Sequence, residues 1–195
     1  MKFEINNKEL LDVYKLMKGF VAKTETRPIL NAVHIICDKD NQTTLFESTN
    51  ASKIARWVIN TKVIEKGECS LLFSKTFLYL LKATKSPIPF DVIIYDEDGV
   101  FKANINGNII ILEARKDEYP KTNQIFDDPI EIYDNEPIFS IAVLEEALKA
   151  MREAGADTVT MGIPKKEASK VRMICKPFYS EHPIVSVITT LRQWH

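Results

Sequence analysis

The sequence predicts an α+β fold made of repeated strand-helix-strand-strand half-units, with helices on one face of antiparallel sheets. Three observations lead to this prediction. Amphipathic helical patterns follow short apolar strands, strand-like apolar runs follow each helix, and glycines or polar turns separate those runs. The pattern recurs about every 60 residues, which is too long for a solenoid repeat and suits half of an α+β domain.

The first two half-units are expected within residues 1–120 and share one order of elements. Each begins with an apolar strand (KFEI, ECSLLF) and continues into an amphipathic helix (NKELLDVYKLMKGFVAK, SKTFLYLLKATK). The strands that follow read ILNAVHIICD, TTLFES and IARWVINTKVI in the first half-unit, and FDVIIYDED and VFKANINGNIIILEA in the second. Gly99 and Gly107 mark turns between the later strands. We therefore predict one domain over residues 1–120.

A third half-unit is predicted over residues 136–195, after a charged, proline-containing linker at 121–135. It begins with EPIFSI, runs through the helical segment AVLEEALKAMREAGA, and ends with the strands DTVTMGIP, KVRMICKPF and PIVSVITTLRQ. Gly155 is the expected C-cap of its helix. A single half-unit cannot bury its sheet alone, so this one is left without an internal partner.

The composition is that of an ordinary globular protein. Of the 195 residues, 45% are hydrophobic and 27% are charged, and the formal net charge is −1. Cys37, Cys69 and Cys175 are too far apart for a zinc site or a disulfide framework, and they suit buried, reduced thiols. No signal-peptide pattern opens the chain and no apolar run is long enough for a membrane span. The sequence thus predicts a soluble, cytoplasmic protein.

Charge is sorted along the chain despite the neutral total. Lys8, Lys15 and Lys18 lie opposite the apolar side of the first helix, and Lys75 and Lys82 lie opposite that of the second. Acidic residues gather instead in the expected loops: Glu25, Asp38, Asp40, Asp96, Glu97, Asp98, Asp127 and Asp128. Such faces can be ordinary solvated surfaces, but a chain sorted in this way can also bind a phosphate backbone on one side.

Two further features bear on that hypothesis. Lys23 and Arg27 flank a proline-stiffened elbow, closed by Pro28, at the end of the first helix, and we expect this elbow to face DNA. The third helix has a mixed polar face, where Lys149 and Arg152 stand among Glu145, Glu146 and Glu153. It is expected to lie less squarely over DNA or to contribute nothing there.

Signatures of catalysis are missing from the sequence. It contains no GxxxxGK[ST], GxGxxG, HExxH or GxSxG motif, and its six glycines offer no phosphate-cradling loop. His34 is expected to be a half-buried strand residue, and the run Asp96–Asp98 before Gly99 is typical of a hairpin turn. We therefore predict no enzymatic activity and no cofactor. A nuclease that uses Asp96 and Asp98 to hold Mg²⁺ is a competing hypothesis.

Several segments resemble one known family. MKFEI followed by a helix, TRPILNAVHI, the pair Thr49–Asn50, GECSLLFSKTFLYLLK and the acidic-aromatic-proline run Asp117–Pro120 resemble the first domain of the bacterial DNA sliding clamp, the DNA polymerase III beta subunit. This resemblance covers roughly residues 1–120. LEEALKAM, DTVTMGIP and VSVITTLR in the third half-unit resemble the closing half of a clamp's last domain, more loosely.

The resemblance implies a ring that encircles double-stranded DNA and tethers a DNA polymerase, with a clamp loader as a further partner. Such clamps carry out no chemistry; their helices line the hole and their sheets join across subunits by edge strands. Carried over, Lys8, Lys15, Lys18, Lys75 and Lys82 would face the hole, and Lys23 and Arg27 would meet backbone phosphate. The weak candidates for a partner-binding pocket are Met173, Thr189 and Leu191, which can equally be core residues.

This sequence also departs from the family pattern. Family rings close as dimers of six half-units or trimers of four, and three half-units fit neither arrangement directly. Most of the middle region that forms the partner groove is missing as well. A homo-oligomeric ring is the leading hypothesis, and four copies would supply the same number of helices. The alternative is a clamp-derived regulator that binds a polymerase or a host clamp through sheet edges without encircling DNA.

Overall fold

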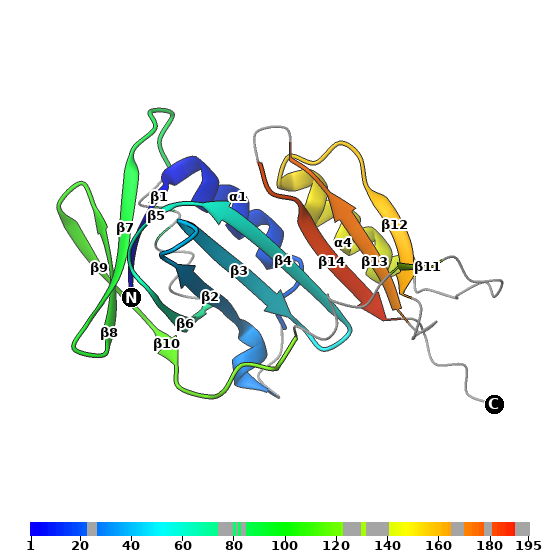
Figure 1. Cartoon of the computed structure of the whole chain (residues 1–195), viewed down its shortest axis with the longest axis horizontal. Coiled ribbons are helices and arrows are strands. Elements are labelled where there is room, and N and C mark those ends of the chain that lie inside the picture. Colours follow the sequence, from blue (N-terminus) through cyan, green and yellow to red (C-terminus); the bar gives the residue numbers. More distant parts are fainter. Residues whose placement is uncertain are drawn as a thin grey trace.

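The structure is a computed structural model that describes residues 1–22, 27–73, 80, 82, 85–122, 130–131, 141–164, 170–177 and 181–189. Its described strands form two antiparallel sheets, and helices α1 (Asn7–Lys18) and α4 (Ile141–Glu153) lie against them (Figure 1). The predicted α+β class is confirmed. Among the described residues, no helix combines the length and the apolar character that crossing a membrane requires.

The smaller sheet has five strands in the order β5-β1-β7-β8-β9. They are β5 (Lys62–Glu65), β1 (Lys2–Asn6), β7 (Asp91–Glu97), β8 (Val100–Ile105) and β9 (Asn108–Leu112). The larger sheet has nine strands in the order β10-β6-β2-β3-β4-β14-β13-β12-β11. They are β10 (Ala114–Arg115), β6 (Gly67–Leu72), β2 (Ala32–Asp38), β3 (Thr43–Thr49), β4 (Lys53–Asn60), β14 (Ile184–Thr189), β13 (Lys170–Cys175), β12 (Thr160–Pro164) and β11 (Ile130–Glu131).

The first two half-units exchange their opening strands. β1 precedes α1 but pairs with β7, the strand that follows the second helical segment, with Phe3 opposite Ile94. Reciprocally, β6 leaves the second half-unit to pair with β2, with Cys69 opposite Ile35. Each half-unit thus lends one strand to the other half's sheet. This exchange gives residues 1–115 an approximate internal two-fold symmetry.

The third half-unit continues the sheet of the first. β14 pairs antiparallel with β4, with Trp57 opposite Ile184 and Ala55 opposite Ser186. The nine-stranded sheet therefore runs from β10 to β11 (Figure 1), and β11 lies within the linker that the sequence predicts at 121–135. The predicted division into a domain at 1–120, a linker at 121–135 and a half-unit at 136–195 stays a prediction.

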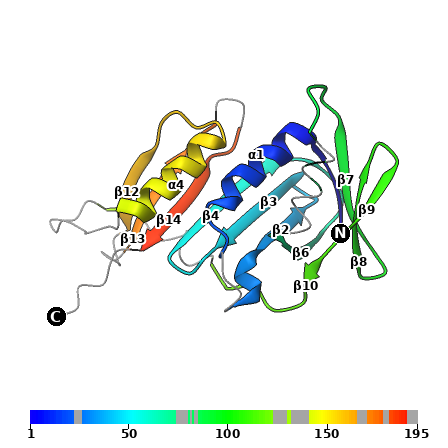
Figure 2. The ribbon, with the colours of Figure 1, turned by 180° about the vertical axis from the view of Figure 1, so that it is seen from behind.

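Helices α1 and α4 lie side by side on one face of the nine-stranded sheet (Figure 2). α1 begins after Asn6, whose Oδ1 accepts a hydrogen bond from the Lys8 backbone N–H, and it ends at the C-cap Gly19. Leu10, Val13, Leu16 and Met17 from α1 are buried, and so are Ala147, Ala150 and Met151 from α4. One hydrophobic core therefore continues beneath both helices.

The structure differs locally from the expected element bounds. The first helix stops at Gly19 instead of continuing through Lys23. The segment Pro28–Asn31 forms a 3₁₀ helix, η1, because Pro28 starts a tight turn, so the strand β2 begins only at Ala32. The run IARWVINTKVI divides at Thr61, where β5 leaves for the other sheet. Buried Thr61 shares a 2.6 Å hydrogen bond with Thr44 at this break.

Candidate nucleic-acid interface

A groove of about 420 Å³ lies between α1 and α4. Its lining includes three lysines, Lys15 and Lys18 from α1 and Lys149 from α4, together with the carboxylates of Glu146 and Glu153. The structure thus brings together cations from helices that are more than 100 residues apart in the sequence. Lysines in that arrangement can contact phosphate groups along a nucleic-acid backbone.

The lysines of the groove differ in how firmly they are held. Lys15 Nζ lies 2.6 Å from Asp12 Oδ1 on the same helix, and its side chain is 37% exposed. Lys18 is exposed and forms no ion pair with the described residues. Lys149 is 76% exposed and lies 4.0 Å from Glu153, a distance at which an exposed pair contributes little. Lys18 and Lys149 are therefore the cations most available to a phosphate.

The third helix repeats the cationic spacing of the first. If the buried residues Val13, Leu16 and Met17 are aligned with Ala147, Ala150 and Met151, then Lys15 falls on Lys149 and Lys18 on Arg152. Both Lys149 and Arg152 are exposed. The position of α4 therefore gives no support to the expectation that the third helix contributes little to DNA binding. That expectation stays untested. The glutamates of α4 lie on this polar face as expected, with Glu146 and Glu153 in the groove.

One of those glutamates, Glu146, forms an ion pair with a lysine of the sheet beneath α4. Lys53 Nζ, at the start of β4, lies 2.5 Å from Glu146 Oε2, and the Lys53 side chain is 1% exposed. The same ammonium lies 5.3 Å from the ring centroid of Phe20. The ion pair neutralises the Glu146 carboxylate and joins α4 to the first half-unit. It leaves the groove less acidic than its sequence indicates.

The basic elbow borders the same groove. The backbone N–H of Ala22 donates to the carbonyl of Leu30 at 2.8 Å, which ties the end of α1 to η1. Ala22 and Asn31 both line the groove. Arg27 is exposed directly before Pro28, at the N-cap of η1. Pro28 therefore begins the turn that follows Arg27, and a contact between Arg27 and phosphate stays a prediction.

The remaining predicted site residues are only partly described. Lys8 is exposed in the first turn of α1, and Lys82 is exposed at a helical position. Lys23, Lys75 and Leu191 lie outside the described residues, as does the Thr189 side chain at the end of β14. Met173 is fully buried in the core, so it offers no surface to a partner in this structure. These assignments to DNA or partner binding stay predictions.

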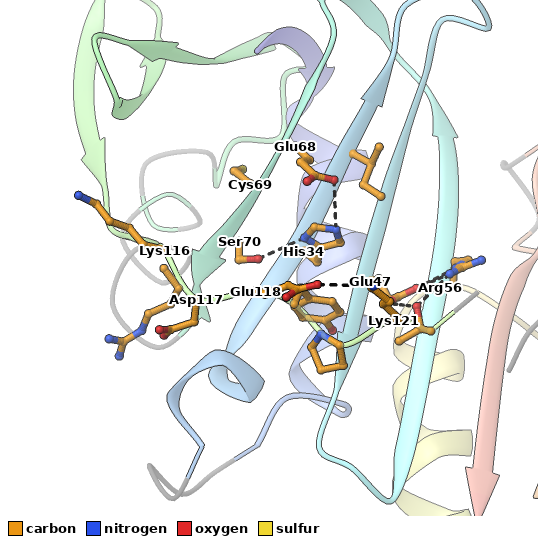
Figure 3. A pocket seen from close by; sticks show the side chains of 15 residues that line it. His34, Glu47, Arg56, Glu68, Cys69, Ser70, Lys116, Asp117, Glu118 and Lys121 are labelled. Carbon is orange, nitrogen blue, oxygen red and sulfur yellow. Dashed lines mark hydrogen bonds and ion pairs between the residues drawn. The ribbon is translucent and has the colours of Figure 1, made fainter. Parts of the chain in front are cut away.

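A second cavity, of about 470 Å³, lies on the opposite face of the nine-stranded sheet (Figure 3). His34, Glu47 and Arg56 stand opposite one another on β2, β3 and β4, and they alternate with the core residues Ile35, Phe46 and Trp57. Since side chains alternate along a strand, the polar row must point away from the helices. The segment from Arg115 to Thr122, which contains the DEYP run, lines this cavity.

Specific contacts hold the DEYP segment on the sheet. The ring of Tyr119 stacks on that of His34, with centroids 4.5 Å apart and planes 7° apart. Thr122 Oγ1 donates to Glu47 Oε1 at 2.6 Å, while Glu47 also pairs with Arg56 at 2.8 Å. Burial lowers the pKa of His34, and burial raises the pKa of Tyr119. His34 is half-buried as predicted, and its Nδ1 lies 3.2 Å from Ser70 Oγ.

Sequence reasoning did not predict the contacts of this polar row. Glu47 and Arg56 lie in runs that are otherwise typical of strands, and Thr122 lies more than 60 residues beyond them. A cross-strand signal was nonetheless present, because a charged residue recurs at outward positions of two adjacent strands. The hydrogen bond between Thr122 and Glu47 anchors the DEYP segment on the sheet. We therefore assign the polar row a structural role, in contrast to the exposed cations between α1 and α4.

The acidic run Asp96–Asp98 forms the hairpin turn that its sequence predicts. Gly99 N–H donates to Asp96 Oδ1 at 2.9 Å, and Gly99 has a φ of +79°. Lys102 pairs with Glu97 in the same hairpin. Across the described residues, no group of three or more His, Cys, Asp or Glu side chains is arranged to hold a metal ion. This arrangement gives the nuclease hypothesis no support.

The arrangement of sheets and helices is shared with proteins of known structure. The DNA polymerase sliding clamp of Bacillus subtilis superposes with a TM-score of 0.76 at 12% identity, over 100% of this chain and 65% of the clamp. The sliding clamp of Pseudomonas aeruginosa gives a TM-score of 0.78 at 10% identity, over 98% of this chain and 67% of the clamp. The chain has the sliding-clamp fold.

A third sliding-clamp structure agrees with these two. The DNA polymerase beta subunit of Streptococcus pyogenes gives a TM-score of 0.78 at 15% identity, over 97% of this chain and 65% of the subunit. At the level of sequence, no protein-family model matches the chain and no curated protein matches it. The chain spans slightly less than two thirds of the length of the Bacillus subtilis clamp. The predicted resemblance to the sliding clamp is confirmed at the level of fold.

Proposed function

We propose that the protein is a sliding-clamp-like processivity factor, a non-enzymatic ring that tethers a DNA polymerase to double-stranded DNA. One observation carries this proposal. α1 and α4 lie side by side on one face of a continuous sheet (Figure 2), and cations recur at the same helical positions, Lys15 with Lys149 and Lys18 with Arg152. Lys15, Lys18 and Lys149 line the groove between the helices, whereas Arg152 borders the cavity beside Leu148. A ring built by repeating this unit would line its hole with such helices.

The charge of the groove suits contacts that slide. Lys18 and Lys149 are exposed and Lys15 is partly exposed, and the carboxylates of Glu146 and Glu153 line the same groove. Contacts to phosphate made by exposed lysines are independent of sequence and weaken as salt rises. A protein held on DNA by topology needs no stronger attraction, and a net charge of −1 is compatible with this mode of binding.

Ring closure requires edges that can pair with another copy. β9 is the last strand of the five-stranded sheet, and its Ile109 and Ile111 are 59% and 70% exposed. β4 occupies the equivalent place in the other sheet, where it pairs with β14. An exposed apolar edge of this kind is a template for strand pairing between chains. We propose that β9 forms an intersubunit sheet.

The alternative function, a regulator that binds a polymerase or a host clamp without encircling DNA, would use the same edge. The β9 edge favours neither function, because an edge strand can pair with either kind of partner. The paired cations of α1 and α4 favour the clamp, since a regulator that only docks on proteins has no need of them. The two functions differ in how the protein would be retained on DNA.

The deciding experiment measures retention on a linear duplex whose two ends carry biotin. The protein is incubated with open ends, the ends are then blocked with streptavidin, and the salt concentration is raised. A ring that has threaded onto the duplex should remain on DNA whose ends are blocked. It should slide off DNA whose ends are open. Equal loss from both substrates would contradict encirclement and favour the regulator.

A charge-reversal series tests the groove in the same assay. We expect Lys18→Glu with Lys149→Glu to weaken association with the open duplex at low salt by at least tenfold, because two phosphate contacts become repulsive. The matched control is Lys39→Glu with Lys66→Glu, which makes the same charge change on exposed residues of the strand turns. Equal effects of the two pairs would show that total charge, and not the groove, governs binding.

A further inference from the structure

The side of α4 that faces away from α1 carries apolar residues that are only partly covered. Ile141, Leu144 and Leu148 recur at helical spacing on this side, opposite the groove residues Glu146 and Glu153. Ile141 is 74% exposed, and Leu144 and Leu148 are half-buried. Leu148 also borders an open cavity of about 350 Å³ together with Val159 and the charged residues Arg152 and Asp157.

The equivalent positions of α1 are more deeply covered, and one of them contacts the second half-unit. In the alignment of α1 with α4 given above, Leu10 corresponds to Leu144 and Tyr14 to Leu148. Leu10 is fully buried, and the Tyr14 ring stacks on that of Phe73 with centroids 4.9 Å apart and planes 8° apart. Phe73 directly follows β6, the strand that the second half-unit lends to the first. This side of a half-unit is therefore the surface on which its companion packs.

The companion surfaces of the first two half-units are related by an approximate two-fold axis. The exchange of β1 and β6 between their sheets is reciprocal, so this axis relates the strands of one half-unit to those of the other. A surface that is complementary to a rotated copy of itself is what an isologous dimer interface requires. Within the described residues, the third half-unit has no such companion on the far side of α4.

We propose that the third half-units of two copies pack on one another through the far side of α4 and complete a domain across the two chains. Ile141, Leu144 and Leu148 of each copy form the centre of this interface, and Val159 lies at its margin. The occupant is a second copy of this chain, since the fold already pairs half-units in this manner within residues 1–115. The internal pair supplies both the geometry and the apolar character of the contact.

This interface would give the assembly an even number of chains. Two copies joined in this way carry six half-units, because each contributes three. If two such pairs then join through their β9 edges, four copies close a ring. An antiparallel contact between two β9 strands is compatible with a two-fold axis, as the antiparallel pairing of β4 with β14 illustrates. The inference about α4 concerns assembly alone and does not depend on DNA binding.

The test measures the solution mass of the full chain by native mass spectrometry and light scattering over a concentration series. We expect the wild type to form dimers or tetramers. Ile141→Asp should weaken the α4 contact about 100-fold, because it places a charge at the centre of an apolar interface. Ile141 is exposed, so this substitution does not disturb the folded monomer. Ile88→Asp is the matched control, since Ile88 is 71% exposed on a loop before β7.

A cross-linking experiment locates the contact. Leu144→Cys places a thiol near the proposed two-fold axis, and we expect mild oxidation to join two copies at this residue. The native thiols do not compete, because burial raises the pKa of Cys37 and that of Cys175 to about 11 and also raises the pKa of Cys69. The matched control is Ile88→Cys, which should give no disulfide-linked dimer under the same conditions.

Defined outcomes would overturn the inference. A chain that stays monomeric at all concentrations, or a trimer, has no isologous contact at α4. An even-numbered assembly that Ile141→Asp and Ile88→Asp affect equally would show that the contact lies elsewhere. A trimer that remains on end-blocked DNA would still support the proposed clamp function, so failure of this inference is distinguishable from failure of that function.

Discussion

His34 lies at the centre of the contacts that hold the DEYP segment against the sheet. Its ring stacks on Tyr119, and its Nδ1 lies 3.2 Å from Ser70 Oγ. The carboxylates of Glu47 and Glu68 and the guanidinium of Arg56 face it from the strands around it. Burial lowers the pKa of His34 in spite of the two carboxylates, so the folded protein resists protonation at this residue.

This lowered pKa predicts a loss of stability in mild acid. An unfolded histidine has a pKa of about 6.5, so below this pH the unfolded chain binds a proton that the folded chain resists. The free energy of unfolding should therefore decline as the pH falls from about 7 toward 5. His34→Phe, which keeps a ring beside Tyr119, should reduce that slope in urea titrations at several pH values. A slope that is the same in His34→Phe as in the wild type would contradict this prediction.

Lys53 and Glu146 form the ion pair that links the first and third half-units. Glu146→Ala removes the carboxylate that faces a nearly fully buried ammonium, and we expect a cost of about 1–3 kcal/mol in urea unfolding. Glu153→Ala removes the exposed partner of Lys149 and should cost about 0.5 kcal/mol or less. Equal costs for the two variants would mean that the buried pair adds no stability beyond that of a surface pair.

At the scale of elements, the contact between α1 and α4 depends on two small residues. A Cβ atom added at Gly19 would lie 2.5 Å from Ala150 Cβ, well inside van der Waals contact. Gly19 has a φ of −75°, so a substitution there meets no backbone strain and its effect reports the helix contact alone. Close approach of the two helices therefore requires glycine at this position.

A double-mutant cycle measures this requirement. Gly19→Ala should destabilise the protein by about 1–3 kcal/mol, because it overpacks the helix contact. Ala150→Gly removes the clashing methyl group, so the double variant should recover stability relative to Gly19→Ala in chemical denaturation. Additive costs in the double variant would show that the two residues do not share a contact in solution.

The elements themselves show what sequence patterns can and cannot predict. The amphipathic spacing of α1 and α4 predicted both helices, because burial on one face is a local property of the sequence. The pairing of β4 with β14 was not predicted, since edge partners depend on contacts between residues more than 100 positions apart. Similarly, the sequence around Lys53 is typical of a strand and does not predict the ion pair that Lys53 forms with Glu146. Charge sorting thus located the cations of α1 but could not reveal that α4 extends them.

At the scale of the whole molecule, the third half-unit extends the larger sheet of the sliding-clamp fold. It attaches to the first half-unit through the pairing of β14 with β4, so one sheet continues through both. The sequence predicts three half-units, because each expected segment has its own helix and strands, and this division stays a prediction. It could not reveal which apolar surfaces are exposed, since only the structure shows the exposure of Ile141 in α4 and of Ile109 and Ile111 in β9.

The exposed edge at β9 yields a prediction about the complete assembly. Ile109 and Ile111 point to the same side of an edge strand, and lysine at these positions would place repelling charges where two copies meet. We expect Ile109→Lys with Ile111→Lys to halve the mass of the largest assembly and to leave the pair that forms through α4. Adding Ile141→Asp should then give monomers in native mass spectrometry. Lysine at Ile88 and Val100, which are exposed elsewhere on the same half-unit, serves as the matched control. An assembly that keeps its full mass with both edge lysines in place would show that β9 is not a subunit interface, and an alternative route to ring closure would then be needed.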